Sequence, residues 1–333
     1  MSISSGAHAR YVSPLINIIK NLIRSARPRQ SAKNGLVLVP LFFTVNIWWA
    51  GAEPSEVALI IAKAAITFLA FSALSSAVYL FNDLRDVEQD RLHPMKRNRP
   101  IAAGTLSPQI AWGALLILIV LGLAAGFVIS VPLGALNTGY VALNIAYTLV
   151  LKHEVILDVM SISAGFVLRA VAGTLAINGT ELTAGGLTSR IDLNISPWMY
   201  VVTALGALFI ALVKRRSELD AAGDDAERQR SILREYSTAL LDQLVVIVAA
   251  STLMAYTLYT FSSGITASSN VPDNNSMMLT IPFVAYGLFR YLYLMHMKGK
   301  GEAPEDALLS DRPLRLNIFL WLGAATLILL LNA

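Results

Sequence analysis

Long apolar runs separated by short polar stretches dominate the chain. A helix needs about 20 mostly apolar residues to cross the hydrocarbon core of a bilayer. Nine stretches are candidates for such helices, namely 36–51, 57–81, 108–130, 132–151, 154–178, 197–214, 238–261, 277–297 and 313–332. Several begin close to a proline, which the first turn of a helix tolerates because the missing N–H has no helical partner there. The pattern therefore predicts an all-α integral membrane protein with nine transmembrane helices.

The distribution of basic residues agrees with this count. Positive residues concentrate in the cytoplasmic loops of membrane proteins. With a cytoplasmic N-terminus, the nine predicted spans leave 21 of the 26 lysines and arginines on the cytoplasmic side. We therefore expect a basic cytoplasmic segment over 1–35 and a single transmembrane domain over 36–333. The charge-rich loops after 57–81 and 197–214 would lie on the cytoplasmic face.

Composition excludes several other classes of protein. The chain is 55% hydrophobic and 14% charged, whereas a soluble globular chain carries about 25% charged residues. It has no cysteine, which excludes disulfides and thiolate metal sites. The four histidines are scattered, which argues against a histidine-rich zinc site. The first 35 residues hold no long apolar run, so we expect no cleavable signal peptide.

The densest group of charges follows the second predicted span. Four oxygen-bearing side chains there are spaced three or four residues apart and would share one stripe of a helix. They are Asn82, Asp83, Asp86 and Asp90. Hard oxygen ligands in such a row suit Mg²⁺, which keeps several waters and shares its shell with substrate phosphates. The alternative is a solvated helix end with salt bridges, but we predict a metal site whose three aspartates are the candidate catalytic residues.

A basic loop bounded by prolines comes directly after this stripe. Lys96, Arg97 and Arg99 lie within it. Lysine and arginine bind phosphate groups, and arginine does so through two parallel N–H donors. The alternative is that the loop is basic only because it faces the cytoplasm. Its position beside the carboxylates favours a phosphate-binding role.

Further ionisable residues lie at or inside the later spans. Lys152, Lys214 and Arg215 stand near predicted cytoplasmic helix ends and offer positive charge to a lipid phosphate, which carries about two negative charges. Asp158 and Arg169 lie within the fifth predicted span, where charged side chains are costly and are functional candidates by default. Pairing with neighbouring helices is the structural alternative for both.

The stripe and the basic loop together resemble a known family. The pattern Asn82-Asp83-x-x-Asp86-x-x-x-Asp90, followed by His-Pro-x-Lys-Arg-x-Arg-Pro-Ile-Ala-Ala-Gly, resembles the first motif of the UbiA superfamily of intramembrane prenyltransferases. The resemblance covers residues 25–333 and implies a helical bundle around a central cavity that is open to the cytoplasm. It also implies that the motif binds a diphosphate through Mg²⁺.

The second charged loop resembles one branch of that superfamily. Ordinary members carry a second aspartate-rich motif there, whereas this chain reads Lys214-Arg215-x-x-Glu218. Together with Arg27-Pro28-x-Gln30-x-x-Lys33-Asn34, this pattern resembles the branch that transfers phosphoribosyl groups to decaprenyl phosphate. The resemblance implies that Lys33, Asn34 and Glu218 also bind substrate.

We therefore expect a Mg²⁺-dependent membrane enzyme that transfers 5-phosphoribosyl from phosphoribosyl pyrophosphate to a polyprenyl phosphate and releases pyrophosphate. The resemblance implies a bacterial inner membrane and a product that feeds arabinan synthesis for the cell envelope. Two alternatives stay open. One is a UbiA-type prenyltransferase with a prenyl diphosphate donor and an aromatic or isoprenoid acceptor, and the other is a transporter of an anionic solute.

Three further points complete these expectations. We expect no nucleic-acid partner. The sequence leaves open whether the protein forms a homo-oligomer. Asp220 and Asp224 have the spacing of a degenerate second acidic motif, and the sequence does not decide whether they act as one.

Overall fold

The chain is helical along most of its described length. The computed structural model describes residues 14–48, 53–184, 187–191, 196–222, 231–261, 271–298 and 310–332. The long helices are α4 (Pro54–Arg85), α6 (Pro108–Ile129), α7 (Val131–Leu149), α8 (Leu157–Ile177), α9 (Pro197–Ala222), α11 (Thr238–Thr260), α12 (Ile281–Lys298) and α14 (Arg312–Leu331). The shorter helices are α1 (Pro14–Ala26), α2 (Val39–Phe43), α3 (Val45–Trp48) and α5 (Val87–Leu92). Short 3₁₀ helices are η1 (Pro28–Leu38), η2 (Lys96–Asn98), η3 (Leu151–His153), η5 (Ser231–Glu235) and η7 (Ser276–Thr280).

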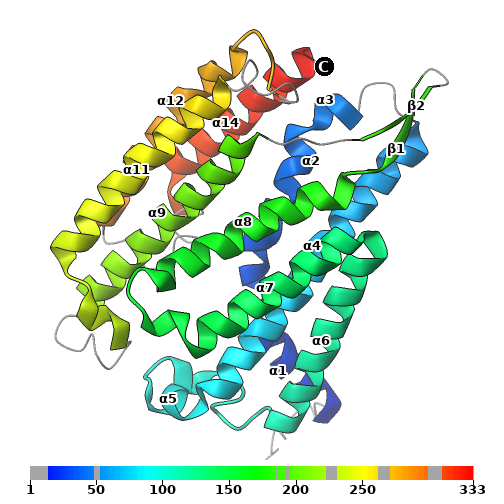
Figure 1. The fold of residues 1–333 in the computed structure, drawn as a ribbon. Coiled ribbons are helices and arrows are strands. Elements are labelled where there is room, and N and C mark those ends of the chain that lie inside the picture. The colour runs from blue at the N-terminus through cyan, green and yellow to red at the C-terminus, as the bar shows by residue number, and fades with distance from the viewer. Residues whose placement is uncertain are drawn as a thin grey trace, which may run out of the picture. The chain divides into compact units, whose positions relative to one another are not determined.

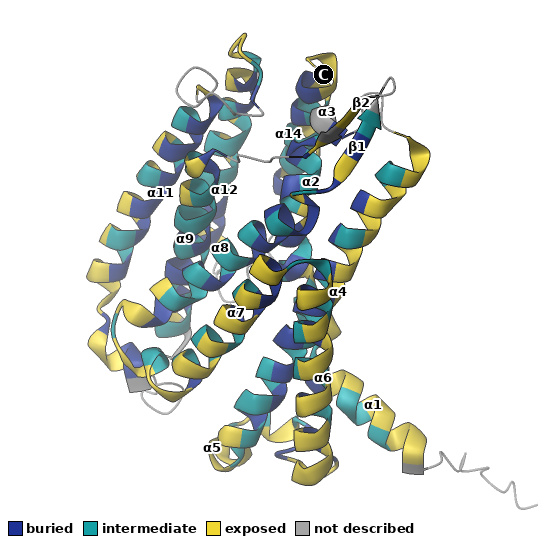
Figure 2. Cartoon of the chain, turned by 45° about the vertical axis from the view of Figure 1, so that its right-hand side comes forward, coloured by how far each residue is buried: buried dark blue, intermediate teal, exposed yellow. Residues whose placement is uncertain are grey.

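Seven of the described helices are long and apolar enough to cross a membrane, which agrees with a mainly helical integral membrane architecture. Much of α6 is exposed (Figure 2), and its Val120 and Leu121 have exposed fractions of 63% and 59%. Such residues suit contact with lipid tails. α7 is long enough to span but is more polar, because Asn137, Thr138 and Asn144 interrupt its apolar sequence. The count of nine spans, and the cavity open to the cytoplasm, stay predictions.

The prediction of one continuous helix over 36–51 is wrong for its described residues, 36–48. These run through the end of η1, then α2 and α3, with a break at Thr44. The Thr44 backbone N–H and hydroxyl both donate to the Pro40 carbonyl oxygen, at 3.1 and 2.7 Å. A hydroxyl that bonds back to the preceding turn bends a helix, and Pro40 itself has no N–H to give. Apolar content alone does not reveal this break.

The chain divides into two compact units. The first comprises the described residues of Met1–Ala32 together with Ser72–Leu121, and the second comprises those of Lys33–Phe71 and Gly122–Ala333. The apolar core of the first unit is built from the end of α4, the loop that follows and the start of α6. Leu80, Ile101, Leu106 and Leu115 are buried in it.

In the second unit, α9 lies between α8 and α11 (Figure 1). α7 and α2 pack on α8, and α12 packs on α14. One apolar core surrounds Phe43, Tyr259 and Trp321. A second core surrounds Leu241 and Tyr291. Helices far apart in the sequence thus share the cores of this unit.

A short β-hairpin departs from the all-α expectation. Strands β1 (Glu181–Ala184) and β2 (Leu187–Arg190) pair antiparallel, with Glu181 opposite Arg190. The Glu56 carboxylate at the start of α4 accepts a hydrogen bond from the Thr183 N–H at 2.9 Å. Threonine residues in both strands favour extended pairing, but eight strand residues are too few to stand out beside the long apolar runs.

Gly173 allows the chain around Val37 to approach α8 closely. A Cβ atom at Gly173 would lie 2.0 Å from the Val37 carbonyl oxygen and 2.9 Å from Pro40 Cδ. No real side chain tolerates such contacts, so glycine is required here. This approach positions η1 and α2 against α8.

We predict that Gly173→Ala lowers the free energy of unfolding by about 1–3 kcal/mol, because overpacking must displace backbone. The measurement is the thermal unfolding midpoint of the purified protein in detergent. Gly323→Ala is the matched control, since no atom lies within 4 Å of a Cβ at Gly323. An unchanged midpoint for Gly173→Ala would contradict the packing described.

Candidate active site

The predicted acidic stripe lies where α4 ends and α5 begins. Asp83 and Asp90 are buried, whereas Asn82 and Asp86 are half-buried. The Asp86 N–H donates to the Asn82 carbonyl at 2.9 Å, and the Asp90 N–H donates to the Asp86 carbonyl at 2.8 Å. The helical spacing therefore continues through the break at Asp86, and the four residues follow one another along one helical path.

Arginine side chains compensate the two buried carboxylates. Arg99 Nη1 donates to Asp83 Oδ1 at 3.1 Å and to Asp90 Oδ2 at 2.7 Å. Arg27 also forms an ion pair with Asp83 Oδ1. A buried carboxylate is costly unless a cation and hydrogen bonds compensate it. The acidic stripe and part of the basic loop are thus one structure.

The structure adds Arg27 to the residues predicted for this site. Arg27 follows α1 directly and has a φ of 52°, a backbone conformation that residues other than glycine seldom adopt. Its guanidinium lies 4.9 Å from the centre of the Tyr79 ring. The only sequence signal was the position of Arg27 in the family pattern before Lys33 and Asn34. Nothing local predicts its partner, which lies 56 residues away.

The basic loop is shaped by a neutral histidine. Partial burial and the neighbouring Lys96 ammonium lower the pKa of His93. His93 Nδ1 accepts from the N–H groups of Met95 and Lys96 at 3.2 and 3.3 Å. Of the predicted phosphate-binding residues, Arg97 is exposed and Lys96 is half-buried. This turn thus presents lysine and arginine close to the carboxylates in sequence.

One carboxylate oxygen at this site suits a cation. Asp83 Oδ2 is buried and, among the described residues, has no hydrogen-bond partner. Within that same part of the chain, no three acidic or histidine side chains are gathered closely enough to form a complete metal cage. Mg²⁺ does not require one, because it binds through one or two carboxylates together with water and substrate phosphates. The oxygen ligands present therefore fit Mg²⁺.

Asp158 and Arg215 form a second, fully buried cluster in the other unit. Asp158 has an exposed fraction of 0% and accepts from Arg215 Nε at 2.8 Å. It also accepts from the Tyr236 hydroxyl at 2.7 Å. Arg215, itself 2% exposed, pairs further with Glu218. Three residues predicted to bind substrate thus bind one another.

Tyr236 joins this cluster to the chain before α8. Its hydroxyl accepts from the Ile156 N–H at 2.8 Å, and Ile156 has a φ of 69°. Burial, together with the hydrogen bond to Asp158, raises the pKa of Tyr236. The phenol is therefore neutral at physiological pH and serves as a donor to Asp158. Nothing in the sequence pattern around Tyr236 predicts this role.

The neighbouring lysines differ from Arg215. The Lys214 side chain is 42% exposed, and its ammonium lies 3.9 Å from a Glu218 oxygen. Lys152 is half-buried in η3. These two positive groups are more accessible to a ligand than the Arg215 guanidinium.

Arg169 and Asn34 meet in a third cluster. Arg169 Nε donates to Asn34 Oδ1 at 2.8 Å, and its other nitrogens donate to the Gly165 carbonyl and the Tyr140 hydroxyl, both at 2.7 Å. Both residues are buried, whereas Lys33 is half-buried. Arg169 and Asn34 are both predicted functional residues and lie 135 positions apart in the sequence, and the structure brings them into contact.

The degenerate second acidic motif has only one member in the described residues. Asp220 forms an ion pair with Arg216. Arg216 also donates to Asp242 at 2.7 Å. Asp224 lies outside the described residues. Asp220 is thus already engaged with a positive partner.

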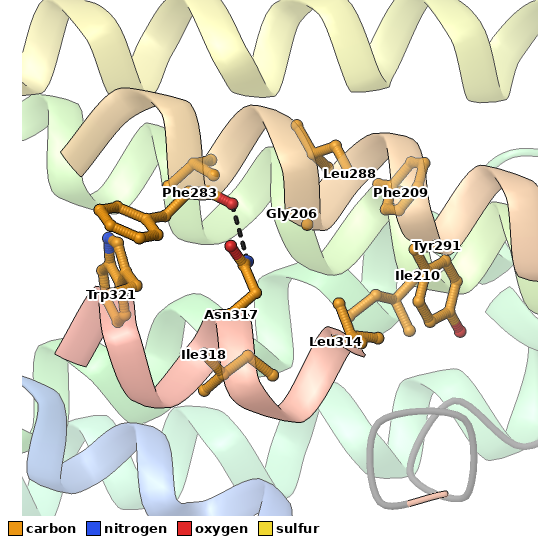
Figure 3. Close-up of a pocket in the computed structure, with 12 residues that line it drawn as sticks. Gly206, Phe209, Ile210, Phe283, Leu288, Tyr291, Leu314, Asn317, Ile318 and Trp321 are labelled. Carbon is orange, nitrogen blue, oxygen red and sulfur yellow. Dashed lines mark hydrogen bonds between the residues drawn. The ribbon is translucent and has the colours of Figure 1, made fainter. Parts of the chain in front are cut away.

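An apolar pocket of about 300 Å³ lies among α9, α12 and α14 (Figure 3). Phe209, Leu288 and Ile318 are among its lining residues. Asn317, which also lines it, donates from its amide nitrogen to the Phe283 carbonyl at 2.8 Å. The walls therefore suit a hydrocarbon chain rather than a charged ligand.

Comparison with known proteins connects this arrangement to a family. Residues 37–330 match the UbiA prenyltransferase family. The chain belongs to this family. The family resemblance predicted from the acidic stripe is thereby confirmed.

Relatives within the UbiA family match nearly the whole chain. A protein of Mycolicibacterium smegmatis called decaprenyl-phosphate phosphoribosyltransferase is 33% identical over 93% of this chain and 92% of its own length. A Corynebacterium glutamicum protein with the same name is 34% identical over 92% of this chain and 86% of its own.

Solved UbiA structures share the fold. A UbiA homolog from Archaeoglobus fulgidus, solved with GPP and Mg²⁺, has a TM-score of 0.64 and 16% identity, and the match covers 93% of this chain and 99% of that one. The same homolog with DMAPP and Mg²⁺ gives a TM-score of 0.63 at 15% identity, with the same coverage of both chains.

We predict that Asp158→Ala lowers the free energy of unfolding by about 3–5 kcal/mol, because it leaves part of the buried Arg215 guanidinium without its partner. Thermal unfolding in detergent measures the change. Lys214→Ala, one residue from Arg215, removes an exposed pair and should cost less than about 1 kcal/mol. Equal stability of the two variants would show that Asp158 does not support Arg215.

Proposed function

We propose that this UbiA-family protein transfers the 5-phosphoribosyl group of phosphoribosyl pyrophosphate to decaprenyl phosphate. The observation that carries the proposal is the nearly end-to-end match to the proteins called decaprenyl-phosphate phosphoribosyltransferase. The basic second loop agrees with it, because a lipid phosphate acceptor needs positive charge where a second acidic motif would repel it. In this proposal the protein is a membrane transferase.

The acidic stripe is the proposed site of the donor pyrophosphate. Asp83 and Asp86 would hold Mg²⁺, with Asn82 and Asp90 completing the oxygen-rich surroundings. The buried, unpartnered Asp83 Oδ2 supports this assignment. When bound, the metal supplies positive charge that stabilises the departing pyrophosphate.

Arg27 and Arg99 are proposed to balance charge at the same place. Both side chains are partly exposed, at 29% and 27%. They neutralise Asp83 when no ligand is bound, and their remaining N–H donors can bind pyrophosphate oxygens. Lys96 and Arg97 add further donors from the same loop. These contacts orient the donor for in-line attack.

The acceptor phosphate is assigned to Lys214 and Lys152. Asp158, Arg215 and Glu218 would support Lys214 by fixing the end of α9. Each of their charged groups already has a buried partner. The third cluster has a similar supporting role, with Arg169 fixing Asn34 beside Lys33.

The reaction needs no general base. The bond between ribose C1 and the pyrophosphate oxygen breaks, and a bond between C1 and a lipid phosphate oxygen forms. Pyrophosphate leaves with the electron pair of the broken bond. The acceptor is already an anion, so no proton has to be removed. Attack from the face opposite the leaving group predicts inversion at C1.

The membrane arrangement is part of the proposal. We infer nine crossings, with α7 and the broken segment over 36–51 added to the seven apolar helices. The basic loops would then face the cytoplasm of a bacterial inner membrane. Residues 1–35 form the N-terminal segment and 36–333 the catalytic domain. The product would supply arabinan synthesis in the cell envelope.

The proposal is tested with purified protein, labelled phosphoribosyl pyrophosphate and decaprenyl phosphate. We expect label in the lipid phase in the presence of Mg²⁺ and none after chelation. A parallel reaction supplies a prenyl diphosphate with an aromatic acid. Absence of label in the lipid, together with turnover of the prenyl diphosphate, would replace the proposal with the prenyltransferase alternative.

We predict that Asp86→Ala lowers the transfer rate by roughly 10²-fold or more, because the metal supplies several kcal/mol of charge stabilisation. The matched control is Glu88→Ala, whose carboxylate is 84% exposed and pairs with the exposed Arg91. Mn²⁺ titration followed by electron paramagnetic resonance measures binding directly, without turnover. Full activity and unchanged Mn²⁺ binding in Asp86→Ala would refute the metal assignment.

A further inference from the structure

Much of helix α1 is exposed (Figure 2), and one of its exposed sides is apolar. Four side chains on it have exposed fractions of 47–65%, namely Leu15, Ile16, Ile19 and Ile23. Lys20 and Arg24 continue the row that begins at Ile16, so two positive charges border the apolar side. The helix contains no acidic residue. An apolar strip edged by cations is typical of a helix that lies in a bilayer surface.

The length of α1 decides between lying on the membrane and spanning it. Its 13 residues extend about 20 Å, whereas the hydrocarbon core is about 30 Å thick. It also carries polar residues on its remaining sides. α1 therefore cannot be a further transmembrane helix.

The other side of α1 is fixed to its own unit. Leu22 packs against the apolar core of that unit. The Asn21 amide donates to the Thr105 carbonyl at 2.9 Å, and the Ser76 hydroxyl donates to the Ala26 carbonyl at 3.2 Å. These contacts hold α1 with Ile19 and Ile23 directed away from the unit.

We propose that α1 is an in-plane membrane anchor that binds anionic lipid head groups. Its exposed leucine and isoleucines enter the surface of the bilayer, while Lys20 and Arg24 contact the negative head groups. Charge complementarity identifies the occupant, because a neutral apolar partner would leave both cations uncompensated. No second protein is required.

The anchor also has a consequence for the acidic stripe. Arg27 is the first residue after α1, and it pairs with Asp83. Pro28 follows at once, and its ring restricts the backbone of Arg27. Little free chain separates the anchor from this ion pair, so the seating of α1 positions Arg27. This second part rests on the proposed function of the stripe.

The test uses the absence of cysteine from the chain. Ile19→Cys and, as the matched control on the polar side, Asn17→Cys each carry one nitroxide label in the full-length protein. The protein is placed in nanodiscs of phosphatidylcholine with or without phosphatidylglycerol. Electron paramagnetic resonance then compares collisions with oxygen, which enters lipid, and with a water-soluble nickel complex. We expect the Ile19 label to favour oxygen and the Asn17 label to favour nickel.

Removal of the two charges separates lipid binding from simple burial. Phosphatidylglycerol should raise the ratio of oxygen to nickel access at the Ile19 label. In Lys20→Gln/Arg24→Gln, this increase should fall by roughly an order of magnitude, the effect expected for two basic residues near an anionic surface. The rate of phosphoribosyl transfer should rise with phosphatidylglycerol in the wild type and stay flat in this variant. Its rate in phosphatidylcholine should equal that of the wild type.

Each outcome decides one part of the proposal. Nickel access at Ile19 in both lipids would overturn the anchor. Shielding from both reagents with spin–spin broadening would overturn it in favour of a second copy of the chain. If phosphatidylglycerol changes the access at the Ile19 label but not the rate of phosphoribosyl transfer, the coupling to Arg27 is overturned. Seating without any transfer by the wild type would refute the proposed function and leave the anchor standing.

Discussion

Buried carboxylates at the ends of membrane helices are the constraint on which the rest of this structure depends. Asp83 and Asp90 in one unit, and Asp158 in the other, are almost fully removed from solvent. An uncompensated charge in such a place costs several kcal/mol. Each carboxylate is accordingly paired with arginine. Arg27 and Arg215 lie 56 and 57 residues from their partners, whereas Arg99 comes from the loop that follows the stripe. The ion pairs therefore fix how the loops return to the helix ends.

The two sets of pairs differ in what they can do. The Arg215–Asp158 pair is buried, with side chains only 2% and 0% exposed. If either residue left the pair to bind a ligand, the other would be an uncompensated buried charge, so this pair suits a structural role. Arg27 and Arg99 are partly exposed although Asp83 is buried. Incoming phosphates can therefore reach these arginines, which suits the acidic stripe better to ligand exchange than the Arg215–Asp158 pair.

The sequence predicted the regular parts of this molecule well, because a long apolar run has few alternatives to a membrane helix. It does not predict where a single local hydrogen bond breaks a helix, as at Thr44, whose hydroxyl donates to the Pro40 carbonyl. It also proposed Arg215 as a phosphate ligand from charge alone. Burial depends on which helices meet, and a row of residues does not reveal that Asp158 and Tyr236 enclose this guanidinium.

The same limit explains why the sequence does not assign Arg27 to the acidic stripe, and it changes how the N-terminal segment is understood. Composition separates residues 1–35 from the apolar remainder, since the segment is basic and has no span. Charge compensation follows a different division, because Arg27 supplies the positive charge that buried Asp83 needs. A segment that neutralises a carboxylate at a helix end belongs energetically to that site. The amphipathic helix before Arg27 is then part of how the membrane surface and the acidic stripe are held together.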